Sequence, residues 1–143
     1  MKAAAARVVL LLGALYCIVG ILFGELAAQA VSPQMLAAWR WAAWVVSAAA
    51  FGTHIVYEQL RLRSSAMITA FHVALAAGLG AFGLAAAANI HAFTVSPHQP
   101  SLLLVLSLAI WPVMTALPAF VVALVAALLF GRVRRLAVRV DTR

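Results

Sequence analysis

Four long apolar stretches occupy almost the whole of this chain, at about residues 7–30, 36–57, 66–93 and 102–130. A helix of ~20 mostly apolar residues is long enough to cross a hydrocarbon layer of ~30 Å. The polar breaks between the stretches are too short to build a separate domain. We therefore expect residues 1–143 to form one all-α transmembrane domain, an integral membrane four-helix bundle that runs up-down-up-down.

The composition excludes a water-soluble fold and offers little material for catalysis. Of the 143 residues, 67% are hydrophobic and 9% are charged, whereas a soluble domain carries roughly 25% charged residues. Catalytic motifs such as HExxH, GxSxG and CxxC are absent. One cysteine, Cys17, allows neither a disulfide within the chain nor a cysteine-based metal site. The sequence thus predicts no catalytic residues and no metal ligands.

The basic residues collect at three places that alternate crossing would put on one side of a membrane. The connections at 31–35 and 94–101 contain neither Lys nor Arg. Because basic residues gather in cytoplasmic loops, we expect both termini and the connection at 57–65 to be cytoplasmic, at the inner membrane of a bacterium. Arg40 is the exception, and the residues that fit are Lys2, Arg7, Arg61, Arg63, Arg132, Arg134, Arg135, Arg139 and Arg143.

The net charge of +7 suggests a partner, and the placement of the charge indicates lipid rather than nucleic acid. In residues 131–143, apolar side chains recur at helical spacing with arginines mostly between them. Anionic lipid attracts such a segment by ~1 kcal/mol per basic residue. We expect this basic amphipathic tail to lie on the inner leaflet.

Residues 1–30 also resemble a secretory signal, with a basic start, an apolar middle and the cleavage pattern Ala28-Gln29-Ala30. The apolar middle is at the long limit for a signal peptide, and Glu25 lies awkwardly close to the cleavage site. We expect the segment to be retained as the first helix, with cleavage as the alternative.

The first stretch carries small residues on one helical face. In lipid, close backbone approach over small residues drives helix association, and a GxxxG pair is included here. A chance match is the alternative, because glycine is frequent in membrane helices. We predict a packing face made of Gly13, Cys17, Gly20, Gly24 and Ala28.

Two charged residues stand near the expected outer surface. Three tryptophans, at positions 39, 41 and 44, mark that interface, and Arg40 lies among them. Glu25 is near the outer end of the first helix, one short connection away. A Glu25–Arg40 ion pair is one interpretation, and an Arg40 side chain that extends to the headgroups is the other.

One cluster of polar residues, His54, Glu58 and His72, could bind a cofactor or transfer protons. His54 and Glu58 are four residues apart, hence on one helical face, and His72 lies about two turns into the next helix. Two imidazoles at similar depth suit a b-type haem or a chlorin, and with Glu58 they suit a proton relay. Ordinary hydrogen bonds between helices remain the simplest interpretation.

The leading functional hypothesis is a small polytopic membrane protein without catalytic activity. It would act as a helix-packing subunit of a larger complex or as a homo-oligomer, with other membrane helices as its partners. One alternative is a haem- or pigment-binding redox protein that uses His54 and His72. The other is a small transporter or channel with Glu25–Arg40 and the histidine cluster as outer and inner polar gates.

Overall fold

A computed structural model describes residues 3–95 and 102–141, with side chains described as far as Val133. This part of the chain is entirely helical apart from short connections and contains no strand. The all-α, four-helix prediction is therefore confirmed. The helices are α1 (Ala3–Ala28), α2 (Pro33–Leu60), α3 (Ala66–Val95) and α4 (Leu102–Asp141).

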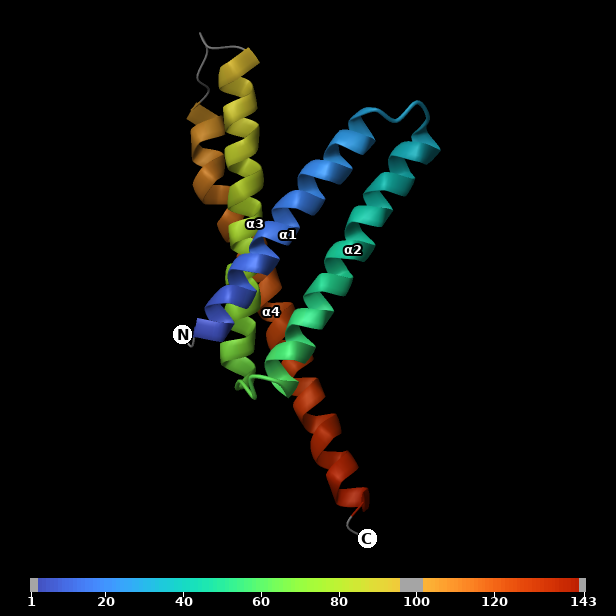
Figure 1. Ribbon diagram of the computed structural model, residues 1–143, viewed down its shortest axis with the longest axis vertical. Helices are drawn as coiled ribbons and strands as arrows, with labels where there is room; N and C mark the ends of the chain where they lie inside the picture. Colours follow the sequence, from blue (N-terminus) through green and yellow to red (C-terminus); the bar gives the residue numbers. More distant parts are fainter. Residues whose placement is uncertain (1–2, 96–101, 142–143) are drawn as a thin grey trace.

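Successive helices run in opposite directions and form two helical hairpins, α1–α2 and α3–α4 (Figure 1). The hairpins meet at the end of the molecule that contains the 61–65 connection and the start of α1, which we call the converged end. Towards the other end, the splayed end, the α1–α2 hairpin leans away from α3 in both ribbon views. The bundle is therefore closed at one end only.

Close approach over glycines fixes the point at which α1 crosses α3. A Cβ atom added at Gly13 would lie 2.9 Å from Cβ of Leu79. A Cβ atom added at Gly83 would lie 2.7 Å from Sγ of Cys17. Each helix thus receives a side chain of the other where it has none of its own, as expected for association in lipid.

The small-residue face of α1 follows this contact for only part of its length. A Cβ atom at Gly20 would lie 2.6 Å from Leu84, but one at Gly24 would meet nothing within 4 Å. Ala28 is exposed. Within the described structure the packing face against α3 thus includes Gly13, Cys17 and Gly20 but not Gly24. The later part of α1 leans away from α3 (Figure 1).

The α3–α4 hairpin forms the most extensive contact in the molecule, and α1–α3 is the next. A polar tie supports it: the side-chain amide of Asn89 donates to the backbone oxygen of Leu104 at 2.8 Å and to Oγ of Ser107 at 3.2 Å. At the converged end an apolar core joins α3, α4 and α2. Its buried members are Ile55, Ala70, Val73, Ala123 and Ala127.

Three of the described helices are long and apolar enough to cross a membrane: α1, α3 and α4 from Leu102 to Val133. The chain is thus an integral membrane protein. The helix α2 does not reach the same apolarity, although we expected residues 36–57 to be a fourth span. Its 28 residues include Arg40, His54 and Glu58, which lower its apolar character.

The helix α4 continues through Pro112, Pro118 and Gly131 to Asp141. The amphipathic segment expected after residue 130 is thus, up to Asp141, the last part of α4. Its side chains beyond Val133 lie outside the described residues.

Candidate functional site

The candidate site lies at the converged end, where α2 ends and α3 begins. The cap residue Arg61 donates its backbone N–H to Tyr57, and Arg63 takes a positive φ of 50°. That conformation is uncommon for a residue with a Cβ atom, and it reverses the chain within a few residues. The backbone N–H of Ser64 then donates to the carbonyl oxygen of Glu58 at 3.1 Å. The tight connection brings the side chains of α2 and α3 together.

The Glu58 carboxylate is the centre of the site and is completely buried. Its Oε2 atom accepts a hydrogen bond from the Ser64 hydroxyl at 2.6 Å. Its Oε1 atom lies 2.8 Å from Nδ1 of His72 and 3.8 Å from Nε2 of His54. The structure therefore brings together the three residues that the sequence grouped, and it adds Ser64.

A second set of bonds holds the connection against α3. The side-chain amide of Gln59 donates to Oγ1 of Thr69 at 2.7 Å and to the carbonyl oxygen of Ser64 at 3.2 Å. Thr69 is fully buried. Because Gln59 and Glu58 are adjacent, the same turn of α2 supplies both the carboxylate and the amide that orders its surroundings.

His54 differs from His72 in having no hydrogen bond. Its ring is 1% exposed, and neither Nδ1 nor Nε2 has a partner within the described part of the chain. Its Nε2 atom lies 3.8 Å from Oε1 of Glu58, which is too far for a hydrogen bond. A buried polar group without a partner is unusual and calls for an explanation.

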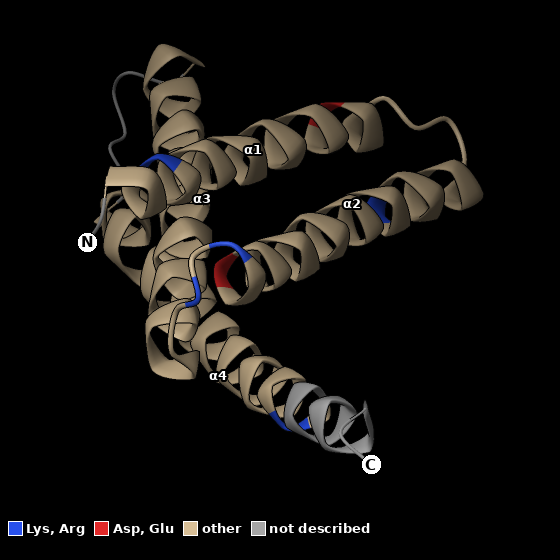
Figure 2. Ribbon diagram, turned by 60° about the horizontal axis from the view of Figure 1, so that its bottom comes forward, with Lys and Arg blue, Asp and Glu red and all other residues tan. Residues whose placement is uncertain are grey.

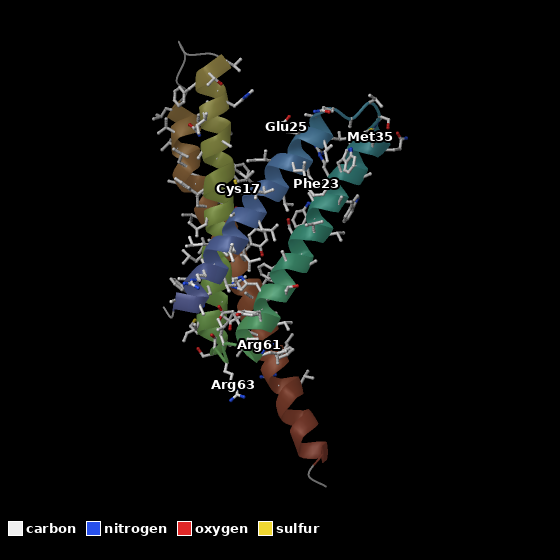
Figure 3. All side chains as sticks on the ribbon, in the orientation of Figure 1. Cys17, Phe23, Glu25, Met35, Arg61 and Arg63 are labelled. Atoms are coloured by element: carbon white, nitrogen blue, oxygen red, sulfur yellow. The ribbon has the colours of Figure 1, made fainter. Side chains whose placement is uncertain are left out.

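The basic side chains near the Glu58 carboxylate are histidines and not arginines. Among the described residues, ion pairs within 4.0 Å join Glu58 only to His54 and His72. In Figure 3 the Arg63 side chain extends away from the helices at the converged end. An isolated buried carboxylate is very costly, so its hydrogen-bond partners have to stabilise it in this position.

The haem or chlorin hypothesis does not fit this geometry. Ligation of one metal by both histidines requires two imidazole nitrogens that face that metal. Here Nε2 of His54 and Nδ1 of His72 both lie within 4.0 Å of one carboxylate oxygen, Oε1 of Glu58. Nor does the described part of the chain contain a group of three or more His, Cys, Asp or Glu residues arranged to hold a metal ion.

The outer pair is not formed. Glu25 and Arg40 are both exposed, and no ion pair joins them in the described residues. In Figure 3 the Glu25 side chain lies on the side of α1 that faces away from α2. An aromatic pair connects α1 and α2 near these residues instead: the rings of Phe23 and Trp39 have centroids 6.1 Å apart.

Arg40 lines an open groove on α2 with a volume of ≈ 520 Å³. Its walls are largely apolar and include Trp41 and Trp44, which are 70% and 74% exposed. The three tryptophans thus differ in orientation: Trp39 packs against Phe23 of α1, and the other two are exposed. The complete lining is Pro33, Leu36, Ala37, Arg40, Trp41 and Trp44.

A comparison with protein-family models, with curated proteins and with solved structures found no match to this chain.

Sequence reasoning missed the residues that surround Glu58. Ser64 and Ser65 precede α3, and each hydroxyl has a different partner. The Ser65 hydroxyl accepts from the backbone N–H of Ile68, while Ser64 binds Glu58. Gln59 gave no signal beyond its polarity, although a polar residue at the end of an apolar stretch next to Glu58 was visible.

Proposed function

We propose that this protein is a non-catalytic membrane component that associates through α2 with further membrane helices, from a second copy or from another polypeptide. One observation carries the proposal. Of the four helices, α2 is the one that is not apolar enough to cross a membrane alone, yet it buries only His54, Ile55 and Glu58 within the described structure. Contact with further protein helices would shield such a helix from lipid.

The free-energy cost of placing Arg40 in a membrane also supports association. A guanidinium group within a membrane helix costs up to about 3 kcal/mol on insertion scales. Arg40 is exposed and has no ion-pair partner among the described residues. Contact with another helix, through an acceptor group or a carboxylate, would reduce this cost. The groove beside Arg40, with two outward tryptophans, offers the concave and aromatic surface that interfaces favour.

We further propose that the converged end faces the cytoplasm, in the inner membrane of a bacterium. Figure 2 shows basic residues near the start of α1, in the 61–65 connection and towards the end of the described part of α4. All three places belong to the converged end or extend beyond it. The basic-residue rule then supports this orientation, with anionic lipid as the partner of the arginines that follow residue 130.

The transport hypothesis receives less support. It required two polar gates, and Glu25 and Arg40 do not form the outer one. The buried cluster at Glu58 remains a candidate for the inner gate. A flux assay in proteoliposomes that responds to Glu58→Gln would favour transport over simple association.

The test of association compares two insertions of the same bulk. Ala37→Trp fills the groove on α2, whereas Val122→Trp adds an indole to a residue of α4 that is 56% exposed and lies far along the chain from the groove. The protein is extracted in mild detergent, and its mass is measured by size exclusion with light scattering. We expect wild type and Val122→Trp to be associated, and Ala37→Trp to be smaller. A monomeric wild type without other polypeptides would contradict the proposal.

A further inference from the structure

Most of the residues that α2 buries within the described structure are titratable. Within the described structure α2 buries three residues, and two of them are His54 and Glu58. Its contacts with α3 and α4 are far fewer than those between α3 and α4. The attachment of α2 to the α3–α4 hairpin therefore combines this polar cluster with a small apolar contact around Ile55.

We propose that His54, Glu58 and His72 form a proton-binding site that controls this attachment. The ligand is a proton, and the inference does not rest on the association proposed above. With both imidazoles neutral and Glu58 ionised, the cluster carries one negative charge. One added proton, shared between Nδ1 of His72 and Oε1 of Glu58 across 2.8 Å, brings the net charge to zero. Because burial disfavours net charge, this singly protonated form is the one that holds α2 in place.

No other charged group takes over this role in the described residues. On α2 and α3 the titratable neighbours of Glu58 are the two histidines. The charged residues of the remaining segments near the converged end are Arg7 on α1, Arg61 and Arg63 in the connection, and Arg132 on α4. All four are exposed, and none lies within 4.0 Å of the Glu58 carboxylate. Their effect is therefore screened by solvent and salt.

Ser64 provides contact with water at the converged end. Its hydroxyl donates to Oε2 of Glu58, and the residue is only half-buried, next to exposed Arg63 and Ser65. The proton therefore enters and leaves on the side of the connection. His54, whose Nε2 atom is 3.8 Å from Oε1, is the place for a second proton. Its unpaired ring atoms are then explained, because the ring gains an ionic partner only on protonation.

Attachment of α2 is thus expected to be strongest at an intermediate pH and weaker on both sides. Above it, loss of the shared proton leaves a buried negative charge. Below it, a second proton on His54 leaves a buried positive charge. Glu58→Gln removes the alkaline change, because a neutral amide needs no compensating proton. His54→Leu removes the acid change and costs no hydrogen bond, because the native ring makes none.

The test measures the distance between α2 and α3 at the splayed end. Spin labels are attached at Gln34→Cys and Ile90→Cys, both exposed positions, in a Cys17→Ala background and in nanodiscs. Pulsed electron paramagnetic resonance follows the distance over about pH 5 to 9, where histidines and perturbed carboxylates titrate. Wild type should show a narrow distribution at intermediate pH that shifts or broadens at both extremes. His91→Gln, an exposed histidine on α3, is the matched control and should change nothing.

A wild-type distance that stays constant over this range would overturn the proposal, and that result needs no variant to fold. An alkaline change that persists in Glu58→Gln, or an acid change that persists in His54→Leu, would overturn it as well. Loss of the alkaline change in Glu58→Gln and of the acid change in His54→Leu would support it. Association in detergent is measured separately, so either proposal can fail without the other.

Discussion

The helices α2 and α3 have nearly the same length, 28 and 30 residues, but they differ in how many of their residues are buried. The helix α3 buries ten of its described residues, most of them Ala or Gly, and lies between α1 and α4. The helix α2 buries three. The contrast shows that small side chains allow a central position in a thin bundle, because they let neighbouring backbones approach from more than one side. A helix with bulky indoles and charged groups stays at the margin, and two of its three buried residues are polar.

The largest expected effect tests whether α2 depends on its polar cluster. Glu58→Ala leaves the Ser64 hydroxyl and His72 without their buried partner. Breaking such a buried pair costs about 3–5 kcal/mol, and we expect failure to fold or a large loss of stability. The measurement is the unfolding midpoint in mixed detergent and denaturant. Stability equal to wild type would show that apolar contacts alone hold α2.

The next effect compares one substitution on the two helices. Gly83→Ala places a Cβ atom 2.7 Å from the native Sγ of Cys17, so α1 and α3 have to move apart. Overpacking of this kind costs about 1–3 kcal/mol. Gly52→Ala on α2 meets nothing within 4 Å and should stabilise the helix by about 0.5–1 kcal/mol. Equal effects at both positions, in the same unfolding assay, would contradict the α2–α3 comparison.

A smaller effect is expected at the polar tie of the α3–α4 hairpin. Asn89→Leu removes the bonds to Leu104 and Ser107 and should cost about 1 kcal/mol, as membrane hydrogen bonds average below 2 kcal/mol. Ser107→Ala is the matched control, because it leaves the bond from Asn89 to the Leu104 carbonyl in place. The control should therefore be the milder of the two. A larger loss in the control would show that Ser107 has another role.

The smallest effect on the fold is expected at Arg40. Its side chain is exposed and has no ion-pair partner among the described residues, so Arg40→Leu should change the unfolding free energy by less than about 0.5 kcal/mol. Association through α2 should nevertheless weaken, because the charge in the groove is lost. Native mass measurement in mild detergent reads the second effect. A strongly destabilised monomer would indicate an intramolecular role for Arg40.

Individual residues show how far sequence reasoning reaches here. The spacing of His54 and Glu58 and the shortness of the following connection were sufficient to predict a cluster with His72. The bond from Ser64 was not predictable, because it requires the positive φ of Arg63 that turns the connection inwards. Glu25 and Arg40 were equally close in sequence terms and do not meet. Which way each side chain points on its helix decided that outcome.

The sequence by itself determined the solvent and the helices of this protein, because apolar length and the distribution of arginines depend on local composition. Only the tertiary structure decided that the bundle opens at one end and that α2 attaches through a buried carboxylate between two imidazoles. The reason is physical: packing in lipid depends on the distance between particular backbones and on the direction of particular side chains. Neither follows from hydrophobicity.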